Sequence, residues 1–242
     1  MKIIILAGGL GTRMSEYTKS IPKPMVKIAG QPMLLHIMRH YLKFGFKSFY
    51  IAGGYKSEVI KSYFKNYKKS GVPFLLNLSN KKCEVVIADT GIKTLTGGRL
   101  KKMKKFINKD ENFMFTYGDG ISDVNINKLL NFHIKNKKIV TVTAVRPPAR
   151  FGEINLKGNI VHSFKEKPQV TSGWINGGFF VAKYSFFKFI FGDKSILEKK
   201  PLEKVCKKKQ LVAYKHFGFW KCMDTKRDKE VLEDILKKRN NL

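Results

Sequence analysis

The stretch Leu6-Ala7-Gly8-Gly9-Leu10-Gly11-Thr12-Arg13 directly follows the apolar run Ile3-Ile4-Ile5 near the start of the chain. A short, uninterrupted apolar run is typical of a strand buried on both faces of a parallel sheet. The glycines after it have no Cβ, so their backbone N–H groups can close around an anion. Arg13, and Lys23 within Pro22-Lys23-Pro24, add two cations. The sequence therefore predicts a buried strand that ends in a phosphate-binding loop.

The spacing of this loop excludes two common phosphate-binding patterns. The P-loop needs Lys followed by Ser or Thr after its last glycine, whereas Thr12-Arg13 follows Gly11 here. The dinucleotide pattern G-x-G-x-x-G is also absent. A tight turn without a ligand is the remaining alternative, but turn chemistry does not explain the two cations.

Strands and helices are predicted to alternate through the first part of the chain. The apolar spacing predicts helices over 31–44, 57–67 and 126–136, and strands over 47–52, 84–88, 112–116 and 139–145. This alternation is typical of an α/β protein, in which helices connect parallel strands.

The second half of the chain has a different, β-rich pattern. After Pro147-Pro148 we predict a hairpin over 151–164, strands over 179–182, 211–215 and 217–222, and a last helix over 226–238. No linker or repeat divides the sequence. We therefore expect one domain over 1–242, with parts of about 1–145 and 146–225 and a C-terminal helix at 226–242.

Composition limits the class of protein. The chain has 242 residues, of which 43% are hydrophobic, so it can bury a core. No apolar run approaches the ~18 residues that a membrane span needs, and no export signal is evident. The three cysteines form no C-x-x-C pair, so neither a zinc site nor a disulfide framework is indicated. We expect a cytoplasmic protein without a membrane partner.

The net charge of +30 raises the alternative of a nucleic-acid partner. Of the 48 basic residues, however, only 7 are arginines, the residue best suited to bidentate phosphate and base contacts. The lysines are scattered over nearly all the predicted helices. We therefore favour a lysine-rich surface and expect no nucleic-acid partner.

Two acidic residues follow predicted strands and are candidate metal ligands. Asp119 lies in Tyr117-Gly118-Asp119-Gly120, where a strand would open into the ligand crevice of an α/β sheet. Asp224 lies between the last predicted strand and the last helix. A pair of carboxylates suits Mg²⁺, which keeps several water ligands. The alternatives are a turn role for Asp119 and a helix N-cap role for Asp224.

Together these motifs resemble those of the sugar-phosphate nucleotidylyltransferases. The matching segments stand in the order of that family and are Leu6 to Arg13, Lys23-Pro24, Gly118-Asp119, Phe151-Gly152, Glu166-Lys167-Pro168, Asn176-Gly177-Gly178 and Met223-Asp224-Thr225. The resemblance implies a Rossmann-like three-layer fold with a mostly parallel central sheet and a small β-rich, sugar-binding portion. One departure is Ile21, which stands where the family usually has the first lysine of Lys-Pro-Lys-Pro.

The reaction implied is an in-line attack of a sugar-phosphate oxygen on the α-phosphorus of a nucleoside triphosphate. Such a transfer requires mainly positioning and charge neutralisation. We expect Arg13 to meet the leaving phosphates, Lys23 the transferring phosphoryl group, and Asp119 and Asp224 to hold Mg²⁺. The catalytic residues expected are Arg13, Lys23 and Asp119.

The resemblance also assigns binding residues. Nucleotide-binding residues are expected at Leu6, Ala7, Gly8, Gly9, Leu10, Gly11, Thr12, Arg13, Thr94, Arg99 and Gly118. Sugar-phosphate-binding residues are expected at Gly152, Glu166, Lys167, Asn176 and Gly177.

The closer resemblance within the family is to members that join CTP to glucose 1-phosphate and assemble as homo-oligomers. It implies that the loop 89–99 recognises the cytosine, with Thr94 and Arg99 near the nucleotide. The same reaction with UTP, dTTP or another sugar phosphate remains an alternative. An inactive nucleotide-binding module is a further one. It would be expected to lack Arg13, Lys23 or an aspartate, and all of these are present.

Overall fold

A sheet of eight strands forms the centre of the computed structural model, which describes residues 1–146, 153–165 and 173–240. The strand order is β13-β9-β12-β7-β1-β4-β6-β5. The strands are β1 (Lys2–Ala7), β4 (Ser48–Gly53), β5 (Pro73–Leu78), β6 (Lys81–Asp89), β7 (Asn112–Tyr117), β9 (Val140–Val145), β12 (Ile175–Lys183) and β13 (Leu211–His216). Only β12 and β5 run antiparallel to their neighbours within this sheet. The sheet is therefore mostly parallel, as predicted.

The central strand β1 is buried on both faces. Ile3 and Ile5 belong to one hydrophobic cluster, and Ile4 and Leu6 belong to a second cluster on the opposite face. Successive side chains of a strand point to opposite faces, so the apolar run supplies both halves of the core. This arrangement places the glycine-rich loop at the end of a strand that is buried on both faces.

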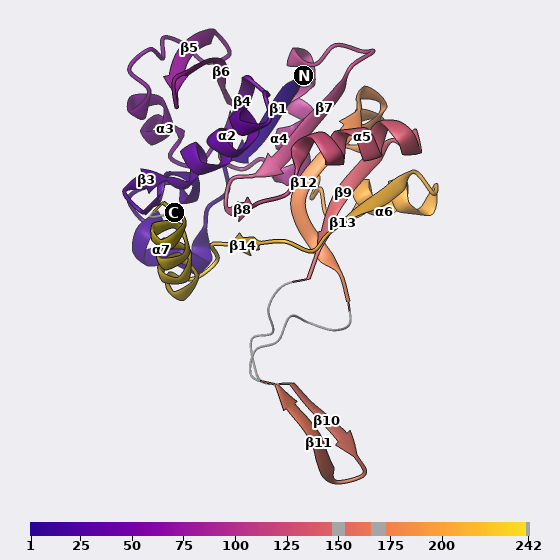
Figure 1. Cartoon of the computed structure of the whole chain (residues 1–242). Coiled ribbons are helices and arrows are strands. Elements are labelled where there is room, and N and C mark those ends of the chain that lie inside the picture. The colour runs from indigo at the N-terminus through magenta and orange to yellow at the C-terminus, as the bar shows by residue number, and fades with distance from the viewer. Residues whose placement is uncertain (147–152, 166–172, 241–242) are drawn as a thin grey trace.

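Helices cover both faces of the sheet (Figure 1). The first cluster includes residues of α2 (Met33–Lys43), α3 (Ser57–Tyr63), α5 (Ile126–Asn136) and α7 (Lys226–Asn240). The second includes residues of α4 (Thr96–Lys102), α6 (Lys200–Lys207), η3 (Met103–Phe106) and η4 (Tyr184–Phe189). The three-layer α/β fold expected from the family resemblance is confirmed.

Short elements complete the described chain. They are η1 (Thr12–Met14), α1 (Ser15–Thr18), η2 (Lys23–Met25), β2 (Lys27–Ile28), β3 (Gln31–Pro32), β8 (Gly120–Ser122), β14 (Trp220–Cys222), β10 (Glu153–Lys157) and β11 (Ile160–Lys165). The last two pair with each other as the predicted hairpin, which lies away from the body in Figure 1.

Some elements differ between the prediction and the structure. The strand predicted over 217–222 is confined to Trp220–Cys222. The helix predicted over 57–67 ends at Tyr63. Strand β5, which was not predicted, pairs antiparallel with β6 through a turn at Ser79 and Asn80. Both turn residues have positive φ, of 51° and 58°, as tight two-residue hairpins require.

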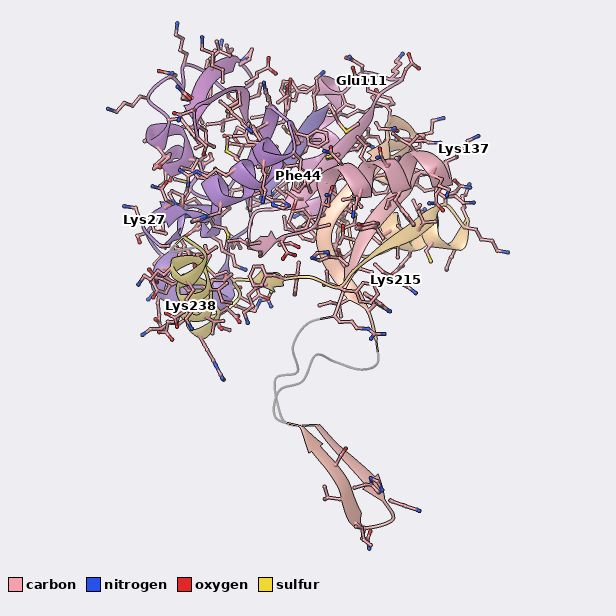
Figure 2. The ribbon with its side chains drawn as sticks, viewed as in Figure 1. Lys27, Phe44, Glu111, Lys137, Lys215 and Lys238 are labelled. Carbon is pink, nitrogen blue, oxygen red and sulfur yellow. The ribbon has the colours of Figure 1, made fainter. Side chains whose placement is uncertain are left out.

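The positive charge is spread over the surface. The labelled lysines Lys27, Lys137, Lys215 and Lys238 lie on separate parts of the body in Figure 2. In the part of the chain that the structure describes, no helix is both long and apolar enough to span a membrane.

Candidate active site

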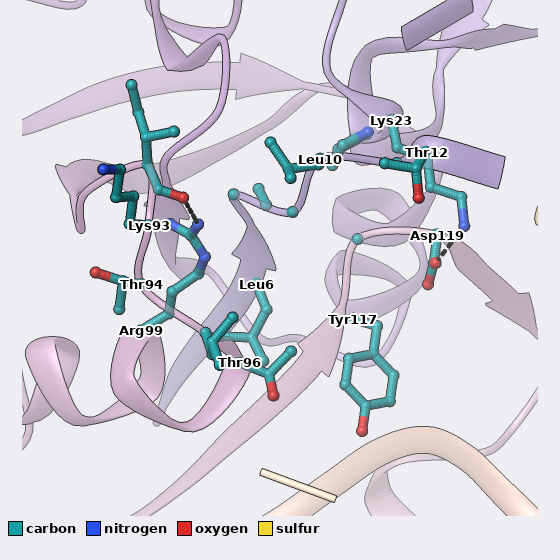
Figure 3. Close-up of a pocket in the computed structure, with 18 of the residues that line it drawn as sticks. Leu6, Leu10, Thr12, Lys23, Lys93, Thr94, Thr96, Arg99, Tyr117 and Asp119 are labelled. Carbon is teal, nitrogen blue, oxygen red and sulfur yellow. Dashed lines mark hydrogen bonds and ion pairs between the residues drawn. The ribbon is translucent and has the colours of Figure 1, made fainter. Parts of the chain in front are cut away.

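A pocket of about 510 Å³ opens where β1 and β7 end (Figure 3). All the residues predicted to bind the nucleotide line it, namely Leu6, Ala7, Gly8, Gly9, Leu10, Gly11, Thr12, Arg13, Thr94, Arg99 and Gly118. Lys23 and Asp119 line the same pocket. The structure thus gathers residues from four separate stretches of sequence at one edge of the sheet.

The glycine-rich loop turns sharply into η1. Gly11 has a φ of +65°, which a residue with a side chain rarely adopts, and a Cβ there would lie 2.8 Å from Thr18 Cγ2. The Thr18 hydroxyl lies 3.0 Å from the carbonyl oxygens of both Gly11 and Met14, which share its single hydrogen. The Thr18 side chain therefore holds the loop in its turn.

A second close approach joins the loops that carry Lys23 and Asp119. A Cβ on Gly118 would lie 2.7 Å from Pro24 Cγ and 2.9 Å from the carbonyl oxygen of Leu6. Only glycine allows the end of β7 to lie this close to the Lys23-Pro24 segment. This contact sets the distance between the lysine and the aspartate.

Arg99 is buried beneath the glycine-rich loop, with only 3% of the residue exposed. Its Nη1 donates to the carbonyl oxygen of Gly91 at 2.8 Å, and its Nη2 to that of Ile92 at 3.2 Å. A Cβ on Gly8 or Gly54 would overlap the guanidinium. Burial lowers the pKa of Arg99. The side chain therefore fixes the 90–92 segment as one wall of the pocket.

Thr94 is buried in the same wall. Its hydroxyl lies 3.1 Å from Lys102 Nζ, which also forms an ion pair with Asp193 at 2.6 Å. Thr94 and Arg99 thus both lie in the pocket wall, and whether they recognise a base stays a prediction.

Asp119 and Asp224 are brought together by a small second sheet. Strands β8 and β14 pair antiparallel, with Cys222 opposite Gly120. The Met223 N–H then donates to the carbonyl oxygen of Asp119 at 2.9 Å. Asp119 lines the pocket, and Asp224, far from it in the sequence, lies beside it on Lys23 and Arg13.

Lys23 lies between the two carboxylates. Its Nζ is 2.7 Å from Asp119 Oδ2 and 2.6 Å from Asp224 Oδ1, and Arg13 Nη1 is 2.9 Å from Asp224 Oδ2. Burial alone would lower the pKa of Lys23, but the two carboxylates outweigh it and raise the pKa. The ammonium therefore stays charged, and Figure 3 shows it reaching toward Asp119.

Thr225, and not Asp224, is the N-cap of α7. The Thr225 hydroxyl accepts from the backbone N–H of Asp228 at 3.2 Å, and the Asp228 carboxylate accepts from the N–H of Thr225 at 3.0 Å. This reciprocal pair is a capping box in which Thr225 is the cap. The side chain of Asp224 is left to face Lys23 and Arg13.

Two of the predicted sugar-phosphate residues lie beside this pocket. Asn176 Nδ2 donates to Tyr117 Oη at 3.1 Å, and the Gly177 carbonyl accepts from Trp220 Nε1 at 2.7 Å. Gly152, Glu166 and Lys167 lie outside the described residues.

Several residues that line the pocket were not among the predicted site residues. They are Pro24, Ile92, Lys93, Leu95, Thr96 and Tyr117. Thr96 lies within the loop 89–99 and Tyr117 directly precedes Gly118-Asp119, so their neighbours could have indicated them. Ile92 and Leu95 are 63% and 39% exposed, and an isolated apolar residue in a loop gives no sequence signal.

A family model described as "Nucleotidyl transferase" matches residues 2–222. The chain belongs to the nucleotidyl transferase family. The enzyme class predicted from the motifs is thereby confirmed.

Two relatives show how close this nucleotidyl transferase is to known members. It is 45% identical to a glucose-1-phosphate cytidylyltransferase of Salmonella typhimurium, over 98% of this chain and 96% of the relative. It is 35% identical to the D-glycero-alpha-D-manno-heptose 1-phosphate guanylyltransferase of Campylobacter jejuni, over 82% of this chain and 81% of the relative. The identification of the chain with the sugar-phosphate nucleotidylyltransferases is confirmed.

Solved structures support the fold independently. A structure titled as apo UDP-glucose pyrophosphorylase superposes with a TM-score of 0.74, covering 99% of both chains at 17% sequence identity. At that identity the likeness shows the fold of this nucleotidyl transferase and nothing finer.

Proposed function

We propose that this nucleotidyl transferase transfers CMP from CTP to glucose 1-phosphate, giving CDP-glucose and pyrophosphate. The observation that carries the proposal is the 45% identity, over nearly the whole of both chains, to a glucose-1-phosphate cytidylyltransferase. The pocket supports it, because the glycine-rich loop, Arg13, Lys23 and Asp119 line one cavity, and Asp224 pairs with both of these cations.

Arg13 and Lys23 are assigned to different phosphate groups of the nucleotide. Arg13 has a side chain that is 72% exposed and a forked guanidinium suited to the departing β and γ phosphates. Lys23 has a side chain only 12% exposed, so its charge is little screened by solvent. We assign Lys23 to the transferring phosphoryl group and its attacking oxygen. Asp119, with which it pairs, completes the catalytic set.

Asp119 and Asp224 would hold Mg²⁺. The fit is supported by the Lys23 ammonium, a cation on which one oxygen of each carboxylate already converges. Across the described ranges, no group of three or more His, Cys, Asp or Glu residues could hold a metal. Two carboxylates are the set that Mg²⁺ uses when phosphates and water complete its shell. The ion would neutralise charge on the phosphates during transfer.

The sugar side of the reaction is assigned to residues beyond the nucleotide pocket. Asn176 and Gly177 adjoin it through Tyr117 and Trp220. We propose that Glu166 and Lys167 contact the sugar phosphate and that Gly152 lies near it. A homo-oligomer and a cytoplasmic location are part of the same proposal.

A different base or sugar is the second candidate. The 35% identity to a heptose 1-phosphate guanylyltransferase shows that related chains are described with another nucleotide and another sugar. An inactive nucleotide-binding module is disfavoured, because Arg13, Lys23, Asp119 and Asp224 are all present and form one charged cluster.

The test measures pyrophosphate release with Mg²⁺ and glucose 1-phosphate, with CTP, UTP, dTTP, GTP and ATP compared side by side. Release with CTP alone is expected. Release with another nucleotide would retain the mechanism and discard the cytidylyl assignment. No release with any nucleotide, across several sugar phosphates, would favour the binding module.

A further inference from the structure

Glu198 joins two walls of the candidate active site. It lies in the segment between η4 and α6, outside every motif of the sequence. Its Oε1 accepts from Tyr117 Oη at 2.6 Å, and its Oε2 accepts from Thr96 Oγ1 at 2.8 Å. Thr96 begins α4 and Tyr117 ends β7. One carboxylate thus connects a helix start to a strand end, both of which line the pocket (Figure 3).

Tyr117 is also hydrogen-bonded to Asn176, which is predicted to bind the sugar phosphate. Asn176 Nδ2 donates to Tyr117 Oη at 3.1 Å, and Asn176 Oδ1 accepts from the Gly178 N–H at 2.9 Å. Gly178 has a φ of +82°, and a Cβ there would lie 2.7 Å from the Tyr117 ring. The Asn176 segment therefore packs directly against the tyrosine.

Glu198 determines which groups donate and which accept along this chain of hydrogen bonds. An ionised carboxylate only accepts, so the Tyr117 hydroxyl must use its single hydrogen on Glu198. Tyr117 Oη can then only accept from its other neighbour, which fixes the NH₂ group of Asn176 toward it. Burial, followed by the Glu198 carboxylate, raises the pKa of Tyr117, so the phenol keeps that hydrogen.

We propose that Glu198 is a positioning residue for the sugar phosphate, acting through Tyr117 on the amide of Asn176. This inference rests on the proposed function and extends it to a residue that no motif indicates. The Oδ1 of Asn176 is bonded to Gly178 and one of its two amide N–H groups is bonded to Tyr117. The second amide N–H is therefore a donor of fixed direction. A sugar hydroxyl or phosphate oxygen is the acceptor that this donor suits.

The second oxygen of Glu198 makes the arrangement rigid. Thr96 Oγ1 accepts from the Leu197 N–H at 2.9 Å while donating to Glu198. The carboxylate is therefore held from two sides even though the residue is exposed. Replacing one oxygen by an NH₂ group would turn an acceptor into a donor and reverse one of these bonds.

The test compares Glu198→Gln with the unmodified enzyme in steady-state kinetics. The variant keeps the shape of the side chain, so the fold should survive. The KM for glucose 1-phosphate should rise about tenfold, as for loss of one charge-assisted hydrogen bond. The KM for CTP should stay within about twofold. Glu203→Gln, on the exposed face of α6, is the matched control and should change neither.

A double-substitution cycle separates positioning from general destabilisation. If Glu198 acts through Asn176, then Glu198→Gln should add almost nothing to Asn176→Ala. Tyr117→Phe, which removes the connecting hydroxyl, should reproduce the glutamine variant. Equal rises in the two KM values, or additive effects in the cycle, would overturn the role of Glu198.

The two proposals fail in different ways. An unmodified enzyme that neither binds glucose 1-phosphate nor releases pyrophosphate would overturn the proposed function, and this inference with it. An active enzyme whose Glu198→Gln variant has unchanged kinetics would overturn the inference alone.

Discussion

Lys23 and Asp119 form an ion pair across 96 positions of the sequence, with Nζ 2.7 Å from Oδ2. The same ammonium lies 2.6 Å from Asp224 Oδ1. Its charge therefore stands between the two carboxylates to which we assign a metal ion. An incoming divalent cation must either share the two carboxylates with this ammonium or displace it. Metal binding is therefore coupled to the position of the lysine side chain.

The first prediction concerns this competition. Replacing Lys23 by methionine removes the ammonium but keeps most of the apolar stem. We expect the free enzyme to bind Mn²⁺, a spectroscopic substitute for Mg²⁺, about tenfold more tightly, since the two carboxylates, with only Arg13 left to compensate them, attract it more strongly. Turnover should nevertheless fall, because the transferring phosphoryl group loses its cation. Paramagnetic resonance titration measures the first effect without depending on activity.

The control is Lys229→Met, which removes a lysine paired with Glu233 on α7 instead. It should change neither Mn²⁺ affinity nor turnover. Weaker Mn²⁺ binding in Lys23→Met would mean that the lysine helps to build the metal site rather than occupying it.

The second prediction concerns the capping box before α7. The Asp228 carboxylate accepts from the N–H groups of Asp224 and Thr225, at 3.2 and 3.0 Å, and pairs with Lys221 at 2.6 Å. Asp228→Ala should lower the free energy of unfolding by about 1 kcal/mol, as loss of a helix cap does. Mn²⁺ affinity should also fall, because the backbone of Asp224 loses its anchor. Calorimetry and metal titration measure the two effects.

Glu233→Ala removes a carboxylate from the same helix without touching Asp224. A loss of Mn²⁺ affinity as large as that of Asp228→Ala would show that helix stability alone explains the result.

The central part of the site was predictable from sequence because its signals are local. The apolar run before the glycines predicted β1, and the glycines with Arg13 predicted the loop that lines the pocket. The alternation of helical and strand patterns predicted a parallel sheet whose strands are connected by helices. These features depend on neighbouring residues, so periodicity and spacing reveal them.

The parts that were not predicted depend on contacts between distant residues. Glu198 lies 81 positions from Tyr117 and 102 from Thr96, and a single exposed glutamate carries no pattern. Strand β5 begins at Pro73 on the edge of the sheet, where proline and the polar Asn77 weaken the strand signal. Its turn residues, Ser79 and Asn80, show their positive φ only in the structure.

The third prediction concerns Arg99. Four of its hydrogen bonds hold the carbonyls of Gly53, Gly91 and Ile92 and the Thr90 hydroxyl. Lysine cannot reach all of these acceptors. The Gly53 carbonyl keeps the Thr90 N–H, but the Gly91 and Ile92 carbonyls lose a partner, and an acceptor left unpaired in the interior costs ~1–3 kcal/mol. Arg99→Lys should therefore lower the free energy of unfolding by about 2 kcal/mol or more. The KM for the nucleotide should rise as the pocket wall loosens.

Arg39→Lys is the matched control, since Arg39 makes two longer bonds, to Ser79 at 3.2 Å and Gln31 at 3.4 Å. It should leave chemical denaturation and nucleotide KM nearly unchanged. An Arg99→Lys variant as stable as the unmodified protein would mean that water replaces the guanidinium in the wall.

The last prediction concerns stability in mild acid. His133 is 1% exposed, and burial, with a smaller effect of Lys183, lowers its pKa to about 4. At this residue the unfolded chain therefore binds one more proton than the folded chain between about pH 6.5 and pH 4. The stability from neutral His133 is complete above pH 6.5 and declines by up to ~3 kcal/mol toward pH 4. His133→Gln should flatten this decline in melting temperature, whereas His162→Gln, on the exposed hairpin, should not; equal slopes in all three proteins would contradict the assignment.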